Sequence, residues 1–442
     1  MKNKKKITVF GFVILLFLWG VFLFISKLET ANYFLGVDLK LQNLFIAFEY
    51  QKLVIFFKVI TFLGNWQFIF PLVILIALAL WKYKKFKYLW PLLLSVVGSQ
   101  LAQFVLKAIL QKPRSVNSLI FESSYSFPSG HAAIAIAFYG FLIYFFLKTL
   151  KKRKILVFLA FSLLIFLIGF SRIYLRVHYY GDVVAGYFLG AIWLTLGILL
   201  SKSLEHKIVS KILIPFLVLI IFITSCLFYF KLPHLKPILA SKTVVTKDVI
   251  LEFNNKTLPK FTEKLSGASQ QPLSFLIVAK DNQEFLKLFT NEGWTQTERL
   301  TFTGIFNLAE AAFTNKSYPQ GFITPTFWEN KVQDFSFAKL TSQNTVRIRH
   351  HCRFWTTNIK TPNARNLYVG YCSFDKGIKP WLITHEIDPN LDKERDYLLN
   401  DILKTKEVKS FTKFNFVNPI QGRTFQGDYF YTDGRVYLID LN

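Results

Sequence analysis

Three short polar clusters interrupt an otherwise apolar stretch of the chain, and they carry the residue types that phosphoryl transfer needs. The clusters are Lys107–Arg114, Pro128–His131 and Ser171–Asp182. Three of their side chains supply permanent positive charge, and arginine presents a planar fork that matches phosphate oxygens. These side chains are Lys107, Arg114 and Arg172. The clusters therefore indicate a site for a phosphate group.

The second cluster contributes backbone groups to the same site. Ser129 and Gly130 directly precede a helix that is expected to begin near His131. The N–H groups and the dipole of a helix N-terminus favour a bound anion. We therefore expect this cluster to complete an anion-binding cradle with the three cationic side chains.

Two imidazoles remain for the chemical step, which needs an attacking atom in line with a leaving oxygen that becomes protonated. Asp182 lies four residues after His178. On a helix their side chains share a face, so the carboxylate can hold the imidazole in the attacking tautomer. This spacing predicts His178 as the nucleophile and His131 as the acid that protonates the leaving group and later assists water. No metal or cofactor is expected, because the cationic side chains take its place.

Together the three clusters resemble the signatures of the type-2 phosphatidic acid phosphatase superfamily, which includes vanadium-dependent haloperoxidases. The resemblance covers roughly residues 50–201, and the third signature matches in full. The first signature usually ends in Arg-Pro, whereas here Arg114 is followed by Ser115. This departure weakens the expected rigidity of the loop more than its charge. Haloperoxidase activity is not expected of a lipid-embedded chain.

The resemblance implies a role for each matching position. His178 matches the nucleophile, Asp182 the orienting acid and His131 the general acid of the family. Six further positions match residues that bind phosphate in the family. They are Lys107, Arg114, Ser129, Gly130, Ser171 and Arg172.

The composition places these clusters in a membrane protein. Of 442 residues, 52% are hydrophobic and 17% aromatic, which is too apolar for an ordinary soluble protein. Residues 1–231 hold 26 Lys+Arg against 6 Asp+Glu, whereas residues 232–442 hold 27 against 21. The basic residues lie in short runs between apolar stretches. This pattern indicates membrane topology and excludes nucleic acid as a partner.

A membrane-spanning helix needs about 20 mostly apolar residues. Seven stretches approach this length: Ile7–Ser26, Trp66–Trp81, Tyr88–Leu106, His131–Leu147, Ile155–Phe170, Val183–Ser201 and Ile208–Phe230. The first is expected to stay as an anchor, because no small-residue cleavage site precedes Lys27. A further apolar segment, Leu41–Gly64, is interrupted by Glu49, Lys52 and Lys58. It is predicted to lie along the interface or to re-enter.

The orientation follows from the basic turns, because short cytoplasmic loops retain Lys and Arg. Four segments hold 4, 4, 5 and 3 basic residues: the N-terminal tail, Lys82–Lys87, Lys148–Lys154 and Lys202–Lys211. Seven crossings from an inside N-terminus then place all three clusters, and everything after Lys231, outside. One miscounted crossing would invert the tail. The predicted location is a bacterial inner membrane, with the site and the C-terminal domain on the periplasmic side.

The expected fold class is a membrane all-α bundle of about six core helices plus one linking transmembrane helix, followed by a soluble α+β domain. The expected boundaries are 1–206 for the phosphatase domain, 207–231 for the linking helix and 232–442 for the extracytoplasmic domain. In this last domain Asp, Glu, Asn and Thr rise and apolar runs shorten. Its predicted strands are Leu273–Ala279, Val346–Thr356, Leu367–Phe374 and Asp428–Leu441. Its predicted helices are Asn282–Asn291, ended by Gly293, and Asp392–Leu403.

Within the last predicted strand, Asp433-Gly434 favours a tight hairpin turn. An aromatic stripe is expected to belong to the core and not to a lipid-binding face. The stripe consists of Phe327, Trp328, Phe335 and Phe337. A bridge between Cys352 and Cys372 is left open, since only three cysteines occur and no disulfide framework supports the fold.

From about Lys242 to Leu403 the chain resembles the LssY-type C-terminal domain found appended to such membrane phosphatases. Two segments carry this resemblance, Arg347–Trp355 and Thr384–Asp396. A metal site can be drawn from imidazoles and carboxylates in them. Its ligands would be His350, His351, His385, Glu386 and Asp388. A solvated loop with helix charges accounts for the same residues better, so no metal is predicted.

The function predicted from the sequence is metal-independent hydrolysis of a lipid phosphomonoester or pyrophosphate through a phosphohistidine. Undecaprenyl pyrophosphate, phosphatidylglycerophosphate, phosphatidic acid and lipid A phosphates all fit, and the cradle does not choose among them. One alternative is phosphotransfer to a lipid or sugar acceptor. Another is a non-catalytic lipid transport or binding protein, with a periplasmic partner for the C-terminal domain. The retained His131, His178 and Asp182 argue against it. The oligomeric state stays open.

Overall fold

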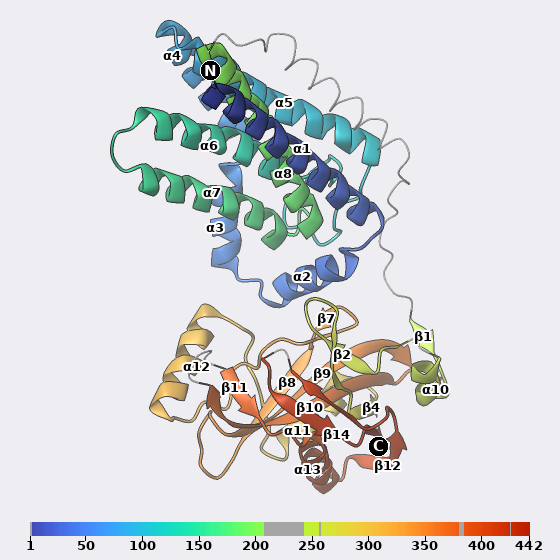
Figure 1. Ribbon diagram of the computed structural model, residues 1–442. Helices are drawn as coiled ribbons and strands as arrows, with labels where there is room; N and C mark the ends of the chain where they lie inside the picture. Colours follow the sequence, from blue (N-terminus) through green and yellow to red (C-terminus); the bar gives the residue numbers. More distant parts are fainter. Residues whose placement is uncertain (1, 207–242, 256–257, 380–383, 425) are drawn as a thin grey trace. The chain divides into compact units, whose positions relative to one another are not determined.

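The computed structural model describes residues 2–206, 243–255, 258–379, 384–424 and 426–442. These residues fall into two compact units, one of residues 2–38 and 49–206 and one of residues 39–48 and 243–442. Within the described chain, six helical segments are long and apolar enough to cross a membrane. The C-terminal unit is rich in strands (Figure 1). The predicted fold class is thereby confirmed. The seventh predicted span, Ile208–Phe230, lies outside the described residues.

The N-terminal part of the chain is helical throughout. Its helices are α1 (Lys2–Thr30), α2 (Leu35–Ala47), α3 (Gln51–Phe62), α4 (Trp66–Lys82), α5 (Phe86–Leu110), α6 (Gly130–Thr149), α7 (Lys154–Tyr174) and α8 (Tyr180–His206). Helix α8 packs against α1, α5 and α6. It approaches α6 closely, because a Cβ added at Gly186 would lie 2.5 Å from the carbonyl oxygen of Ser129. Small residues permit such close helix packing in membrane proteins.

The segment Leu41–Gly64, predicted as one interfacial or re-entrant piece, is divided between α2 and α3. After a short break α3 continues into α4, and together they form an apolar stretch of 32 residues, Gln51–Lys82. Helix α3 packs against α7. The polar residues that interrupt the pattern are accommodated, since Lys52 and Lys58 are exposed and Glu49 lies 2.8 Å from Arg176.

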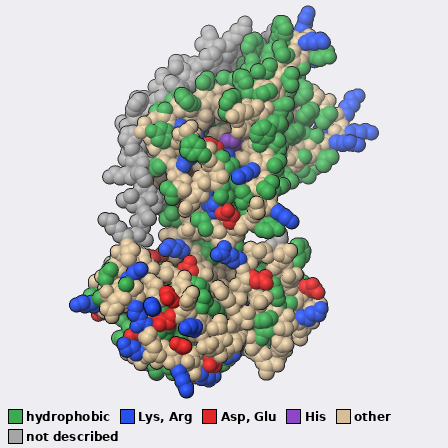
Figure 2. Space-filling view, turned by 180° about the vertical axis from the view of Figure 1, so that it is seen from behind, with side chains coloured by type: hydrophobic (Ala, Val, Ile, Leu, Met, Phe, Trp, Pro, Cys, Tyr) green, Lys and Arg blue, Asp and Glu red, His purple; other side chains and the backbone are tan. Residues whose placement is uncertain are grey.

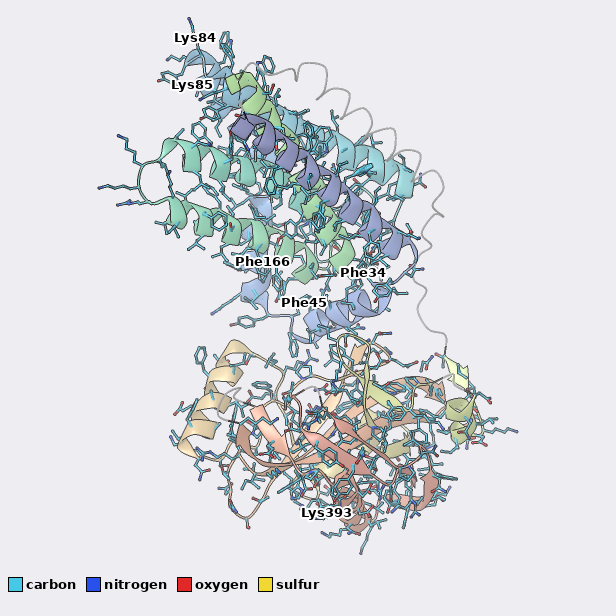
Figure 3. All side chains as sticks on the ribbon, viewed as in Figure 1. Phe34, Phe45, Lys84, Lys85, Phe166 and Lys393 are labelled. Atoms are coloured by element: carbon cyan, nitrogen blue, oxygen red, sulfur yellow. A yellow bond between two sulfur atoms is a disulfide. The ribbon has the colours of Figure 1, made fainter. Side chains whose placement is uncertain are left out.

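Basic turns and polar clusters lie at opposite ends of the helical unit. Helices α5 and α7 end, and α6 and α8 begin, at the end that carries the three clusters. The turns that join α4 to α5 and α6 to α7 lie at the other end (Figure 1). Figure 2 shows basic side chains at the ends of a largely hydrophobic helical surface, and Figure 3 labels two of them, Lys84 and Lys85. This distribution is the one that the charge count requires.

The C-terminal unit is built around a nine-stranded mixed sheet with the order β12-β15-β4-β10-β9-β8-β5, with β1 beside β9 and β11 beside β10. A four-stranded sheet, β3-β2-β6-β7, and the pair β13-β14 complete the strands of the described chain. The strands are β1 (Val244–Val245), β2 (Phe261–Glu263), β3 (Ser269–Pro272), β4 (Phe275–Ala279), β5 (Thr295–Gln296), β6 (Phe327–Trp328), β7 (Lys331–Val332), β8 (Phe335–Leu340), β9 (Arg349–Lys360), β10 (Asn366–Lys379), β11 (Thr384–Ile387), β12 (Val408–Asn415), β13 (Ile420–Arg423), β14 (Tyr429–Thr432) and β15 (Arg435–Leu441). The helices are α10 (Val249–Asn254), α11 (Asn282–Thr290), α12 (Phe302–Thr314) and α13 (Leu391–Lys404).

The large sheet is buried on both faces, which explains the continuous apolar run of its central strand β4. Phe275 and Ile277 enter one core, to which α11 and α13 contribute. Leu276 and Val278 enter a second core on the opposite face, to which α10 contributes. The predicted strands Leu273–Ala279, Val346–Thr356 and Leu367–Phe374 are confirmed as β4, β9 and β10, and the predicted helices as α11 and α13.

The prediction of a hairpin at Asp433-Gly434 is wrong. The turn exists, and Gly434 has φ +75°, but in the described chain β14 pairs with β13 while β15 pairs with β12 and β4. The turn is held from outside: Arg395 of α13 donates to the Asp433 carboxylate at 2.5 Å. The two strands leave the turn toward different sheets.

The open questions about the cysteines and the aromatic stripe have clear outcomes. Cys352 and Cys372 are opposite each other on β9 and β10 and form a disulfide, with a Cα–Cα distance of 4.1 Å. The stripe belongs to the core, as predicted: Trp328 and Phe337 are fully buried and Phe327 nearly so.

Candidate active site

The three clusters meet at one end of the helical unit. The backbone N–H of Ser129 donates to the carbonyl of Asp182 at 2.9 Å, which joins the second cluster to the third. Arg114 joins the first cluster to the third, with Nη1 2.8 Å from the Val177 carbonyl and 3.1 Å from His178 Nε2. The expectation that distant motifs converge on one face is thus met by direct contacts.

His178 is held at both ring nitrogens. Its Nε2 contacts Arg114, and its Nδ1 lies 3.3 Å from Asp182 Oδ2. A guanidinium has no acceptor, so Nε2 must accept and the proton must sit on Nδ1, facing the carboxylate. The lone pair that a nucleophile needs is therefore on Nε2, next to Arg114, a side chain of the type that binds phosphate. Burial and the nearby Arg114 lower the pKa of His178 well below its usual value, which keeps the ring neutral.

Asp182 is fully buried and has more partners than the sequence indicated. Lys112 Nζ lies 2.9 Å from Oδ1, and the Tyr179 N–H donates to Oδ2 at 3.0 Å. The hydroxyl of Ser126 also donates to Oδ2. Lys112 in turn contacts Glu29 of α1. The carboxylate is fixed from several directions, so it can fix the orientation of His178.

Two of the three cationic side chains, Arg114 and Arg172, converge on the carboxylate of Glu122. Its Oε2 lies 2.9 Å from Arg114 Nη2, and its Oε1 contacts Arg172 Nη2. Arg172 also donates to Thr61 of α3 at 2.8 Å. Burial by itself would raise the pKa of Glu122, yet Arg172 and Arg114 lower it to about 2. An ionised carboxylate thus occupies the forks of both arginines, where a phosphate would be expected.

Lys107 extends the positive region. Its ammonium donates to the hydroxyl of Ser124 at 3.2 Å and is largely buried. Ser124 also accepts from Arg114, through its carbonyl at 2.6 Å and its hydroxyl at 3.1 Å. The loop after α5 therefore folds back over the cations that precede it.

The Pro-Ser-Gly-His cluster forms the start of α6, as predicted. Ser129 is the N-cap, and its hydroxyl accepts from the Ala132 N–H at 3.5 Å. The Ser129 N–H is used by Asp182, which leaves the N–H groups of Gly130 and His131 at the open end of the helix. These two groups remain for an anion.

His131 is partly exposed, unlike His178. Its ring lies beside the α3–α4 break, because a Cβ added at Gly64 would be 3.4 Å from His131 Cδ2. It interacts electrostatically with His178 and with the cations Arg172, Lys107 and Arg114. Within the described chain its imidazole has no hydrogen-bond partner, so a ring nitrogen is available for proton transfer.

Ser171, another predicted phosphate ligand, is engaged within its own helix. It is fully buried, and its hydroxyl donates to the carbonyl of Ile168 at 2.6 Å within its own helix. The hydroxyl proton is therefore engaged in this state of the protein. Its neighbour Arg172, by contrast, reaches the cradle.

Several residues of the site were missed by sequence reasoning. They are Glu29, Thr61, Lys112, Glu122, Ser124 and Ser126. A signal for the acids existed: among residues 1–231, which hold only 6 Asp+Glu, most acids pair at this end of the unit. Glu29, Glu49, Glu122 and Asp182 each contact a cation there.

The arrangement can bind an oxyanion and attack it. Figure 2 shows a histidine with acidic and basic side chains near it, on an otherwise largely hydrophobic helical surface. Among the described residues, no group of three or more His, Cys, Asp or Glu side chains is placed to hold a metal ion. In the C-terminal domain His350 and His351 lie on opposite faces of β9, where His350 contacts Glu394 at 2.8 Å and His351 lies 3.3 Å from Asp375.

Known proteins resemble both parts of the chain. The family model of the PAP2 superfamily matches residues 88–205, and that of the LssY C-terminus matches residues 255–436. Phosphatidylglycerophosphatase B of Bacillus subtilis (strain 168) is 36% identical over 156 residues, which are 34% of this chain and 73% of that protein. Lipid phosphate phosphatase delta of Arabidopsis thaliana is 31% identical over 91 residues, 20% of this chain and 22% of that protein.

A solved structure is similar as well. The crystal structure of a transmembrane PAP2-type phosphatidylglycerolphosphate phosphatase from Bacillus subtilis is 30% identical, with a TM-score of 0.38, and the match covers 46% of this chain and 96% of that one. The sequence matches and the three convergent motifs together make the assignment. The chain is a multi-pass membrane protein that belongs to the PAP2 superfamily and carries an LssY-type C-terminal domain.

Proposed function

We propose that this protein hydrolyses a phosphomonoester or pyrophosphate of a membrane lipid through a phosphohistidine on His178. The observation that carries the proposal is the placement of His178 Nε2, 3.1 Å from Arg114 while Nδ1 faces Asp182. A neutral nucleophile beside a cationic fork suits attack on phosphorus. Membership of the PAP2 superfamily supports a phosphoric ester hydrolase acting on lipid phosphates.

In the first step Nε2 of His178 forms a bond to phosphorus while the bond from phosphorus to the lipid oxygen breaks. His131 gives its proton to that leaving oxygen. Arg114, Arg172 and Lys107 stabilise the negative charge that develops on the phosphoryl oxygens. The proposed step therefore uses these side chains in place of a metal ion. Asp182 stabilises the imidazolium character that His178 acquires.

In the second step water attacks phosphorus and the bond to Nε2 breaks. His131, now neutral, takes a proton from the water. Inorganic phosphate leaves and His178 returns to its starting tautomer. If an acceptor alcohol replaced water, the same intermediate would give phosphotransfer, so the products distinguish the two reactions.

We place the site on the outer face of a bacterial inner membrane. Two observations support this orientation. The basic turns lie at the end of the unit opposite the site, as expected of cytoplasmic loops. The C-terminal domain contains the Cys352–Cys372 disulfide, and disulfides persist in oxidising compartments such as the periplasm.

The proposal is tested with purified protein and a panel of lipid phosphates. Phosphatidylglycerophosphate is the first substrate to try, because it is the substrate that the Bacillus relative's name gives. The other members are phosphatidic acid, undecaprenyl pyrophosphate and a lipid A phosphate. Wild-type protein should release free phosphate, and an acid-labile phosphoenzyme should be trapped on rapid quenching.

Replacing His178 with Ala should abolish both signals and leave insertion in the membrane intact. Release of phosphate at the wild-type rate by the His178→Ala protein would refute the assignment of the nucleophile. A phosphorylated lipid or sugar in place of free phosphate would favour phosphotransfer. No turnover on any member of the panel, with a folded protein, would favour a binding or transport role.

A further inference from the structure

A row of polar side chains crosses the centre of the C-terminal sheet. β9 and β10 are antiparallel neighbours, and three facing pairs on one face of them are polar. The pairs are Arg353 with Tyr371, His351 with Ser373, and Arg349 with Asp375. Alternate residues of a strand share a face, and the residues in between, such as Cys352 and Phe354, enter the apolar core. Further along the polar face the same strands carry Trp355 and Val369, which are apolar and buried.

This row lines a cavity of about 130 Å³. The other walls come from different elements, among them Gln271 of β3, Phe327 of β6 and His385 of β11. The cavity lies wholly within the C-terminal domain. Polar side chains at the centre of a sheet give up water, so each of them must be satisfied by protein or by a ligand.

The end of the row at Arg349 is satisfied by the protein. Arg349 donates to Asp375 at 3.1 Å and to the carbonyls of Gly321 and Phe322 at 2.9 and 3.3 Å. His351 Nδ1 lies 3.3 Å from the same aspartate but makes no hydrogen bond within the described residues. Arg349 and Asp375 thus neutralise each other and form the fixed base of the cavity.

The rest of the row is left open, and Arg353 is its centre. Arg353 is 8% exposed. Its Nε donates to the Thr324 carbonyl at 3.1 Å, and its guanidinium lies over the Tyr371 ring at 5.4 Å. Within the described residues neither terminal nitrogen has a hydrogen-bond partner. A buried guanidinium whose fork is empty is costly, and an oxyanion is its natural partner.

Most of the remaining charges at the cavity walls are paired. Asp428 is paired with Lys379, and Glu263 lies 2.6 Å from Lys40. Among the described residues that line the cavity, Arg353 and Lys264 are the cations without an ion pair, and of the two only Arg353 belongs to the buried row. A ligand for this cavity should be an anion.

We propose that the C-terminal domain binds a phosphate group in this cavity, on the fork of Arg353. Two hydroxyls of the row are further donors. Ser373 accepts from Gln271 Nε2 at 3.3 Å, which frees its own proton, and the Tyr371 hydroxyl lies 3.3 Å from that of Thr326. Donors that approach from several directions suit the tetrahedral phosphate better than a planar carboxylate. The cavity is separate from the His178 site, and its binding does not depend on hydrolysis there.

The phosphate could belong to a lipid headgroup or be free, and calorimetry on the full chain separates these sources. We would titrate inorganic phosphate, short-chain phosphatidic acid and, as a planar control, acetate. The Arg172→Ala protein is used in parallel, so that binding in the membrane cradle is weakened and the C-terminal site dominates. Heat with inorganic phosphate indicates a free-phosphate site, and heat with the lipid alone indicates a headgroup site.

In either case Arg353→Gln should weaken binding at least tenfold, the loss expected for a charge-assisted pair. The matched control is Arg347→Gln. Arg347 lies near the start of the same strand, but it donates to the carbonyls of Ala312 and Phe313, which are outside the cavity. Turnover of a lipid phosphate by the membrane site should be unchanged in Arg353→Gln. If Arg353→Gln melts early, Tyr371→Phe and Ser373→Ala replace it, each expected to weaken binding several-fold.

Some results would overturn the proposal. The first is the absence of binding heat with both inorganic phosphate and phosphatidic acid. The second is a phosphate affinity that neither Arg353→Gln nor the two hydroxyl variants change, or that Arg347→Gln lowers as much as Arg353→Gln does. The third is acetate that binds as tightly as phosphate. Failure of the His178 assignment would leave the phosphate heat intact, so the two hypotheses can fail separately.

Discussion

Glu122 is expected to compete with the substrate for the cradle, and its removal is the most informative change in the site. Its carboxylate lies on Arg114 and Arg172 at once. A phosphate can take both forks only when the carboxylate leaves them. Glu122→Gln keeps the size of the side chain and removes the competing charge, so phosphate should bind more tightly.

The size of the effect follows from the electrostatics of Glu122. Its pKa falls from 4.5 to about 2 against the opposing effect of burial, because the two arginines stabilise the anion. This difference corresponds to about 3 kcal/mol. The side chain is 23% exposed and regains water when it swings out, so we expect about half of this energy, or more, to appear in binding. Phosphate should then bind roughly tenfold to a hundredfold more tightly.

The assay is inhibition of lipid phosphate hydrolysis by inorganic phosphate, with KM and kcat measured in parallel. Glu122→Gln should lower the inhibition constant and the KM together. Glu49→Gln is the matched control, because Glu49 pairs with Arg176 at the same end of the unit but touches neither cradle arginine. An inhibition constant that rises, together with a collapse of kcat, would refute this reasoning. Glu122 would then be needed to hold the two forks in productive positions.

Three other predictions concern the site and the second domain. Asp182→Asn should lower kcat by about 10² to 10⁴ with little change in KM, because the amide no longer fixes the attacking tautomer; a kcat near the wild-type value would contradict the role of the carboxylate. Vanadate, which mimics the transferring phosphoryl group, should inhibit while chelators have little effect, and a strict metal requirement in turnover assays would count against the cation cradle. Burial, opposed by Asp375, lowers the pKa of His351 from 6.5 to about 4, so unfolded protein takes up a proton at higher pH than folded protein does. The free energy of unfolding of the C-terminal domain should therefore be at its highest above pH 6.5 and fall by about 3 kcal/mol between pH 6.5 and 4. Denaturant titrations across this range should show the fall in wild type and a flatter curve in His351→Gln.

The chemistry of the membrane site was readable from the sequence because its motifs are local. His178 and Asp182 are only four residues apart and meet at 3.3 Å, although His178 lies in the turn before α8, which begins at Tyr180, and not on the helix that the spacing predicted. Ser129 as an N-cap is a similar case. The structure has both features.

The rest of the site depends on how the loop after α5 folds. Glu122 reaches Arg172, which is 50 residues away in the chain, and Ser126 reaches Asp182 over 56. No periodicity encodes such contacts. The available signal was the scarcity of acids in the membrane half. A carboxylate in a membrane protein is costly to bury alone, so each of these few acids was a candidate to pair with a cation of the site.

The C-terminal sheet repeats this division. The strand over Val346–Thr356 was predicted from the sequence. The register that sets Arg353 opposite Tyr371 was not, because it depends on pairing with a residue 18 positions further along the chain. For the same reason the turn predicted at Asp433-Gly434 is present, whereas the hairpin predicted there is not. Turn chemistry is local, whereas strand partners are chosen by packing.

The contact between Glu29 and Lys112 has a practical consequence for the first helix. Lys112 is shared by Glu29 and Asp182, and all three side chains are buried. If the chain were cut after Thr30, as a leader peptide is cut, Glu29 would be lost. The Lys112 ammonium would then have Asp182, the acid that supports His178, as its single counter-charge. It would also uncover the faces of α5 and α8 that Trp19 and Phe22 now protect. The first helix is thus part of the enzyme's working interior, and trimming it should cost activity as well as membrane attachment.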